Sequence, residues 1–338
     1  MFWTKKPRIG LDLGSYALKC CVLDSKRQSC SIWSEVLLPN RESREDRLEG
    51  EELQSRVQAI LKVCEQRSSH WSRHVNLSLE DPGCVGGYLA LPPLAPQELQ
   101  TAIPSAIAKQ IPYPLSEVEL FNMRVPVLKG KGGTGIFFVA VPRGPMQARV
   151  ALLTSLGLEV KSAEPALLAL IRALVRNHGD LTEPMAVVVA GHSLTSVFVL
   201  LQGVPYFARD FRLGGADFTY AFQMAVQVSW QRAEELKHKS DLRQERSYHL
   251  EPFLVRWMDE VKRSLDQARK QDEALAVGRL LLTGGTAAFM GLESRLQEHL
   301  GLPVSTDAWN RVRHSSIAAE VDDSLVHYDL ALGLALHE

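Results

Sequence analysis

The sequence of 338 residues lacks several features that would place a protein in a membrane or on a charged polymer. No apolar run approaches the roughly 20 residues that a membrane-spanning helix needs. The first residues, MFWTKKPR, lack the apolar stretch of a secretion signal. The net charge is −1, which gives no general attraction to nucleic acid or anionic lipid. We therefore expect a cytoplasmic protein.

Cysteine and histidine do not occur in metal-binding patterns. The five cysteines are an odd number without any Cys-x-x-Cys pair, and the ten histidines show no metal-ligand spacing. This usage predicts reduced thiols, as in the cytosol. Cys20 and Cys21 are adjacent in an apolar segment, so their side chains should point to opposite faces of a strand.

A repeated segment is the most informative feature that is present. Residues 8–24 read RIGLDLGSYALKCCVLD, and residues 186–203 read AVVVAGHSLTSVFVLLQG. Each is an apolar strand, a glycine turn with small hydroxylated residues, and a second apolar strand, with Gly14 matching Gly191. The free amides of such a turn can hold a phosphate. The repeat predicts two similar lobes facing a cleft; the alternative is two unrelated hairpins.

The two copies differ in their chemistry. In the first, Asp12, Ser15 and Lys19 surround the turn, and an acid, a hydroxyl and a lysine suit a metal–triphosphate. In the second, Val189 stands where the first copy has Asp12, and valine cannot accept a hydrogen bond from metal-bound water. The polar residues that remain in the second copy are His192, Ser193 and Thr195.

A third glycine turn lies near the C-terminus. Residues 279–286 read RLLLTGGT, and a helix is expected over residues 287–300. A buried strand followed by Gly284 and Gly285 lets a flat ring approach the backbone closely. Gly-Gly turns also serve as simple connections, so this segment gains its meaning from the other two.

In this order and spacing, the segments resemble the actin-like ATPase superfamily and, within it, the PilM family of type IV pilus assembly proteins, which is related to FtsA. IGLDLGSYALK resembles the first phosphate segment, VVVAGHSLTSVFVLLQGVPYFARDFRLGG the second, and LLLTGGTAAFMGL the adenosine segment. QIPYPLSEVEL from Gln110 and YDLALGLAL from Tyr328 are the stretches most similar to PilM. The resemblance implies an α/β, actin-like (ribonuclease H-like) fold with two lobes and an inserted α+β subdomain.

The resemblance also implies a nucleotide site. Asp12 is expected to hold magnesium through water, and Glu164, in AEPALLALIRAL, to orient the attacking water. Glu234 and Lys237, in AEELK, are expected beside the ribose. The remaining candidates for binding ATP are Gly14, Ser15, Lys19, Gly191, His192, Ser193, Thr195, Gly284, Gly285 and Thr286. Because Val189 replaces the usual acid of the second turn, we expect slow or absent hydrolysis.

The domain boundaries follow from the positions of these segments. The expected order is a first-lobe core over 1–30, an inserted subdomain over 31–148, a return to the first lobe with a connecting helix over 149–184, a second lobe over 185–320 with a helical part over 217–275, and a C-terminal helix over 321–338.

The function implied by the resemblance is a PilM-like scaffold of a type IV pilus, or related secretion, assembly platform at the inner membrane. Such a scaffold is peripheral to the membrane and binds the N-terminal peptide of a PilN-like single-span protein in a groove between the first lobe and the insert. ATP is then a structural or switching ligand. The alternatives are a magnesium-dependent ATPase that drives assembly, an FtsA-like division protein, a degenerate member similar to MshI or GspL, and a sugar kinase. Val189 favours the scaffold over the ATPase, and no sugar-binding acid is evident.

Overall fold

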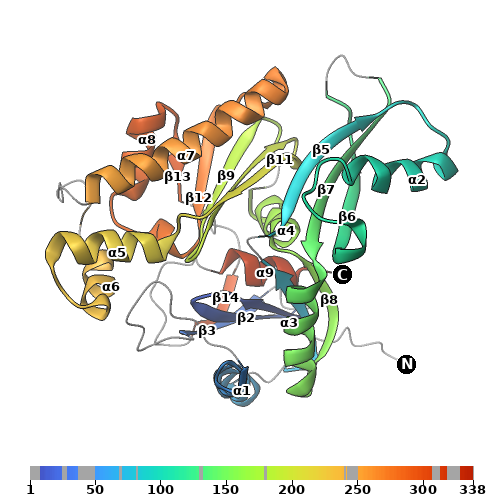
Figure 1. Cartoon of the computed structure of the whole chain (residues 1–338). Helices are drawn as coiled ribbons and strands as arrows, with labels where there is room; N and C mark the ends of the chain where they lie inside the picture. Colours follow the sequence, from blue (N-terminus) through green and yellow to red (C-terminus); the bar gives the residue numbers. More distant parts are fainter. Residues whose placement is uncertain are drawn as a thin grey trace.

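The computed structural model describes residues 8–24, 29–36, 50–67, 71–80, 83–128, 132–178, 181–239, 241, 250–306, 313–317 and 328–337. The strands of this part of the chain form three sheets, and two of them build two lobes with the third beside them (Figure 1). The expected two-lobed α/β arrangement is thus present.

The first lobe is built on a six-stranded sheet with the order β14-β3-β2-β1-β4-β8. Its strands are β1 (Arg8–Leu13), β2 (Ala17–Asp24), β3 (Ser29–Val36), β4 (His74–Leu79), β8 (Glu159–Pro165) and β14 (Arg313–Ile317). Strands β1, β2 and β3 form an antiparallel meander, and β4 runs parallel to β1.

The second lobe repeats this topology in a five-stranded sheet with the order β11-β10-β9-β12-β13. Its strands are β9 (Met185–Ala190), β10 (Thr195–Leu201), β11 (Val204–Phe211), β12 (Arg279–Thr283) and β13 (Val304–Ser305). Strands β9, β10 and β11 form the antiparallel meander, and β12 runs parallel to β9. The repeated hairpin of the sequence is therefore a repeated unit of the fold.

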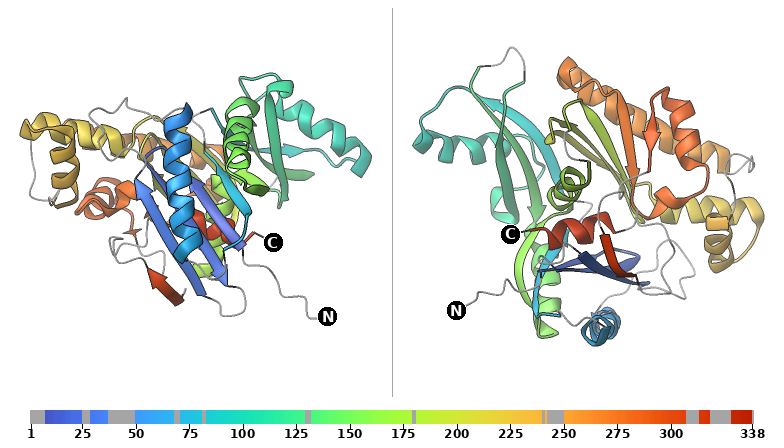
Figure 2. Two further views of the ribbon diagram at one scale, coloured as in Figure 1. Left: turned by 90° about the horizontal axis from the view of Figure 1, so that it is seen from below. Right: turned by 180° about the vertical axis from the view of Figure 1, so that it is seen from behind.

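Helices cover both faces of these sheets. Helix α1 (Gly50–Arg67) crosses the outer face of the first sheet (Figure 2). The remaining helices are α2 (Pro96–Ile107), α3 (Arg143–Ser155), α4 (Ala166–His178), α5 (Gly215–Val226), α6 (Trp230–Lys239), α7 (Leu250–Gln271), α8 (Leu292–Leu300) and α9 (Asp329–Ala335), with short turns η1 (Leu115–Glu117), η2 (Glu273–Leu275) and η3 (Gly285–Ala288). Among the described helices, none has the length and apolar character that crossing a bilayer requires.

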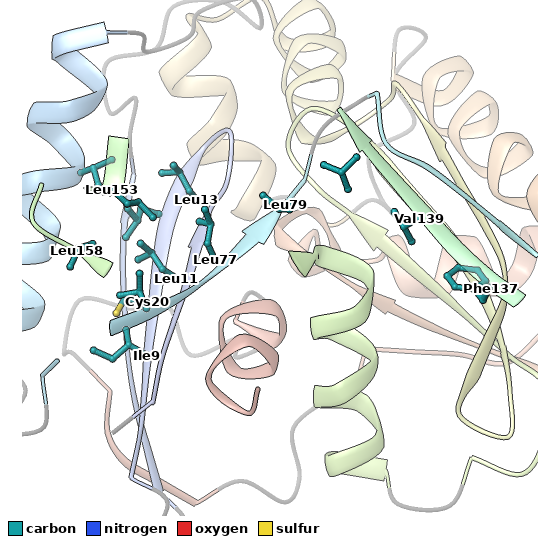
Figure 3. Close-up of a cluster of buried hydrophobic side chains, with 14 of the residues drawn as sticks. Ile9, Leu11, Leu13, Cys20, Leu77, Leu79, Phe137, Val139, Leu153 and Leu158 are labelled. Atoms are coloured by element: carbon teal, nitrogen blue, oxygen red, sulfur yellow. The ribbon is translucent and has the colours of Figure 1, made fainter. Parts of the chain in front are cut away.

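The strands of the first lobe are apolar almost throughout because hydrophobic clusters cover both faces of their sheet. Ile9 and Leu11 of β1 pack with Cys20 and Leu77 (Figure 3). Cys21 packs instead in the separate cluster of α9. The two adjacent cysteines therefore point to opposite faces, as predicted, and both faces of the sheet are buried.

Helix α9 is held tightly between the first sheet and α4. A Cβ atom on Gly10 of β1 would lie 2.0 Å from the carbonyl oxygen of Ala331, and one on Gly333 would lie 1.9 Å from that of Ala169. Only glycine permits such contacts between backbones. The position of α9 at the base of both lobes is thus fixed on two sides.

The inserted subdomain is shorter in the structure than the expected residues 31–148. The three-stranded sheet, in the order β5-β7-β6, consists of β5 (Val85–Leu91), β6 (Val118–Val125) and β7 (Thr134–Pro142). Strands β3 and β4 pair within the first-lobe sheet and α1 lies on it, so they are not part of the insert. The insert is therefore confined to about residues 83–142.

The boundary at residue 320 also changes. Strand β14 pairs with β3 in the first lobe, so the second lobe ends before Arg313. Residues 318–327 of the expected boundary region lie outside the described residues.

The insert also contacts the second lobe. Strand β5 lies beside β11 (Figure 1), and a Cβ on Gly86 would lie 2.9 Å from the Cβ of Ala208. The hydroxyl of Tyr206 donates a hydrogen bond of 2.9 Å to the carbonyl oxygen of Pro126, and its ring contacts that of Tyr88.

Candidate functional site

A cavity of about 610 Å³ lies where the glycine turns of both lobes meet. Its volume is in the range of sites for small molecules and cofactors. Gly14, Gly191 and Gly284 all line it, so the three turns singled out in the sequence converge. The other expected residues in its lining are Asp12, Ser15, Lys19, His192, Glu234, Lys237, Gly285 and Thr286.

The first turn carries a polar cluster on paired strands. The register of β1 and β2 places Asp12 opposite Lys19, and the Nζ atom of Lys19 lies 3.2 Å from Oδ2 of Asp12. The hydroxyl of Ser78 on β4 donates a hydrogen bond of 3.0 Å to Oδ1 of Asp12. An acid held on both oxygens, with a lysine beside it, is pre-positioned for a metal–phosphate ligand.

The second turn is organised by its backbone. The amide of Gly215 donates to the carbonyl oxygen of Gly191 at 2.8 Å, and the amide of Ala216 donates to that of His192 at 2.9 Å. The turn carbonyls thus accept the first amides of α5. Val189 lines the cavity just before this turn and offers no polar group.

The third glycine turn, at Gly284 and Gly285, contacts the second glycine turn, at Gly191. Gly284 has φ of +90°, and a Cβ there would lie 2.6 Å from the carbonyl oxygen of Ala190. Thr286 donates a hydrogen bond of 3.2 Å to the carbonyl oxygen of Gly191. On α6, Lys237 forms an ion pair of 2.8 Å with Glu234, and both line the cavity.

Two expected ligands lie outside the lining of the cavity. Ser193 lies at its rim, where its hydroxyl donates a hydrogen bond of 2.8 Å to that of Ser15. Thr195 is fully buried; its hydroxyl donates to the carbonyl oxygen of Leu213 at 2.6 Å and accepts from Nε1 of Trp257 at 2.9 Å. The geometry gives Thr195 a role in the core of the second lobe.

Glu164, the expected water-orienting residue, also lies outside the lining. Its two carboxylate oxygens accept hydrogen bonds of 2.7 and 2.8 Å from the guanidinium of Arg172 on α4. The same guanidinium donates to the carbonyl oxygen of Gly333 at 2.7 Å. Glu164 is therefore engaged in joining β8, α4 and α9.

Three acids that sequence reasoning missed line the cavity: Glu80, Asp210 and Asp329. Burial, together with the charge of Asp12, raises the pKa of Glu80 to about 7. Burial also raises the pKa of Asp210 to about 6 and that of Asp329 to about 7. Glu80 and Asp329 lie outside the phosphate segments, and Asp210 lies in the trailing strand of the second one. Their positions at the cavity depend on contacts between distant segments. An acid inside the apolar stretch YDLALGLAL was the one available signal.

These residues fit a nucleotide that brings a metal ion with it. In the described part of the chain, no group of three or more Asp, Glu, His or Cys side chains is placed to hold a metal ion alone. Mg²⁺ is commonly held by one or two carboxylates together with phosphate oxygens and water. Asp12 would hold such an ion through water, and Lys19 and the turn amides would contact the phosphates.

Comparison with known proteins gives the family. The model of the family "Type IV pilus assembly protein PilM" matches residues 10–338. A solved PilM–PilN type IV pilus biogenesis complex contains a chain that is 23% identical, with a TM-score of 0.78 and 97% of each chain covered.

Two further solved structures share the fold. The ethanolamine utilization protein EutJ from Carboxydothermus hydrogenoformans is 14% identical, with a TM-score of 0.59 and coverage of 99% of this chain and 91% of its own. MreB5 of Spiroplasma citri bound to ADP is 13% identical, with a TM-score of 0.53 and coverage of 97% and 95%. The fold is thus actin-like, and the chain belongs to the PilM family of type IV pilus assembly proteins.

Proposed function

We propose that this protein is a scaffold of the type IV pilus assembly platform and binds the cytosolic N-terminal peptide of a PilN-like membrane protein. The observation that carries the proposal is the likeness to a chain of the PilM–PilN complex. The match covers 97% of this chain, the insert included, and 97% of the matched chain. Association with such a partner would place the protein at the inner membrane.

The insert offers a surface suited to a peptide. Strand β6 is at the edge of the three-stranded sheet, and no described strand pairs with its outer side. Met123 on this strand is exposed. An edge strand presents backbone donors and acceptors to an extended peptide, and an exposed apolar side chain adds contact area. We place the peptide along the open edge of β6.

The test is a calorimetric titration with the N-terminal peptide of the PilN-like protein. Met123→Glu should weaken binding at least tenfold, because it introduces a charge into an apolar contact. Met290→Glu is the matched control, since Met290 is an exposed methionine of the second lobe. Binding should survive moderate salt, because apolar contacts dominate it. Equal weakening by both substitutions, or by the control alone, would contradict this placement.

We assign ATP the part of a structural or switching ligand of this scaffold. Val189 removes an acid from the second turn, and Arg172 engages the carboxylate of Glu164. Efficient phosphoryl transfer needs a well-held metal ion and an oriented water. A titration with ATP and magnesium, followed by a phosphate-release assay, should show binding with slow or absent turnover. Turnover of several per second would favour the ATPase instead.

A further inference from the structure

The repeated topology locates the position of the missing acid. In the first lobe, Asp12 lies on the central strand β1, opposite Lys19 on β2. In the second lobe, the equivalent strand β9 carries Val189, opposite Ser196 on β10. On its other side, Val189 is paired in register with Thr283 on β12. Paired residues of neighbouring strands point to the same face and lie about 5 Å apart. Val189 and Thr283 both line the cavity.

An acid from elsewhere in the chain lies next to this position. Asp329, the first residue of α9, accepts a hydrogen bond through Oδ2 from the hydroxyl of Thr283. Its carboxylate therefore lies next to β12, the strand that neighbours β9. An acid at position 189 would stand on β9, beside Thr283. The fold thus supplies from α9 a carboxylate that the second lobe lacks on β9.

The other oxygen of this carboxylate has no protein partner. Asp329 is 3% exposed and lines the cavity, and its Oδ1 atom forms no hydrogen bond with any described residue. A buried, unsatisfied carboxylate oxygen is costly. A ligand that carries positive charge or a donor would compensate for this cost.

Backbone contacts fix the position of Asp329, and its carboxylate interacts electrostatically with Lys19, which follows the first glycine turn. The close contacts of Gly10 and Gly333 hold α9 between β1 and α4. The charge of Lys19 acts on Asp329, and the same lysine forms the ion pair with Asp12. Carboxylates from β1 and α9 therefore share the field of one cation at the base of the cavity.

We propose that Asp329 is the second acid of a divalent-cation site, and that with Asp12 it holds the hydration shell of a magnesium ion bound to the phosphates of a nucleotide. In this site Asp329 takes over the position left by Val189. Two carboxylates, phosphate oxygens and water form a usual magnesium environment. The proposal rests on the nucleotide part of the proposed function and is independent of the peptide site.

The test measures the affinity of a fluorescent ATP analogue in Mg²⁺ and in EDTA. For the unaltered protein we expect Mg²⁺ to increase the affinity at least tenfold. Asp329→Asn keeps the shape and an acceptor for Thr283, so it should retain the affinity in EDTA and lose most of the magnesium effect. Binding of Mn²⁺ in the presence of the analogue, followed by electron paramagnetic resonance, should weaken in parallel. Val189→Asp combined with Asp329→Asn should recover part of the magnesium effect.

Asp210→Asn is the charge-matched control. Asp210 lines the same cavity and also accepts a hydrogen bond from a hydroxyl, that of Ser196. This variant should keep the magnesium effect. An unchanged magnesium effect in Asp329→Asn, an equal loss in both variants, or an equal loss of affinity in Mg²⁺ and EDTA would each overturn the role of Asp329. Absence of all nucleotide binding in the unaltered protein would overturn both this site and the nucleotide part of the proposed function. Thermal unfolding verifies that each variant is folded.

Discussion

Ser193 donates a hydrogen bond of 2.8 Å to Ser15, and this contact joins the glycine turns of the two lobes. Beside it, the rings of Tyr16 and His192 stack with their centroids 4.7 Å apart. Each turn thus contributes one hydroxyl and one ring from the residues that directly follow its glycine. The tips of the repeated hairpins meet at the place where the phosphates of a nucleotide are expected.

Ser193→Ala should therefore increase the affinity for ATP. Phosphates between the turns require the hydrogen bond to break, and a neutral hydrogen bond is worth about 0.5–1 kcal/mol net, or roughly two- to fivefold in affinity. Ser15→Ala is the comparison: it breaks the same bond but also removes a candidate phosphate ligand, so it should show no gain. A titration with ATP measures both. A tenfold loss in Ser193→Ala would show instead that Ser193 contacts the nucleotide.

Gly284→Ala should destabilise the protein and abolish nucleotide binding. The backbone has φ of +90° here, and the added Cβ would lie 2.6 Å from the carbonyl oxygen of Ala190. Strain of this kind costs about 1–3 kcal/mol before the clash is counted. Gly278→Ala is the control, because apart from the residue itself and its two chain neighbours no described atom lies within 4 Å of its Cβ position. Unfolding in denaturant should separate the two variants, and equal stability would refute the argument.

Glu164→Gln should lower stability more than it changes phosphate release. Glu164 is 5% exposed and forms two hydrogen bonds with Arg172, so losing its charge should cost about 1–3 kcal/mol. The same substitution at Glu235, in the exposed pair with Arg232, should cost well under about 1 kcal/mol. A hundredfold slower phosphate release with unchanged stability would instead support the expected catalytic role of Glu164.

Local patterns predicted the parts of the fold that depend on neighbouring residues. The repeated hairpin, the three glycine turns and the opposite faces of Cys20 and Cys21 follow from strand periodicity and turn chemistry. The extent of the insert did not follow from such patterns. The assignment of β4 to the first lobe depends on its pairing with the distant strand β1, which leaves no local signal. Strand β3 pairs with the neighbouring strand β2, and this local hairpin was missed.

The candidate site divides in the same way. Asp12, Lys19 and Gly191 belong to the repeated hairpins and were predicted, and they line the cavity. Asp329 reaches the cavity because α9 returns to the first lobe, and its hydrogen bond with Thr283 joins residues 46 positions apart. The pairing of Glu164 with Arg172 depends on the angle between β8 and α4, which sequence spacing does not determine.

Asp210→Asn should make the protein more stable at neutral pH but not in acid. Desolvation within the cavity raises the pKa of Asp210 from its ordinary 3.8 to about 6, although the residue as a whole is exposed. Its carboxyl faces Ser196 and the nearby carboxyl of Glu80. Between these two pKa values the folded state holds a proton that the unfolded chain has released. The contribution of Asp210 to the free energy of unfolding therefore falls as pH rises from about 4 to about 6 and is constant above. Because the side chain opens onto the cavity, solvent screening should keep the gain near or below about 1 kcal/mol. Denaturant unfolding of both proteins at intervals across this range measures the difference. A difference that does not change with pH would show that Asp210 does not titrate in this window.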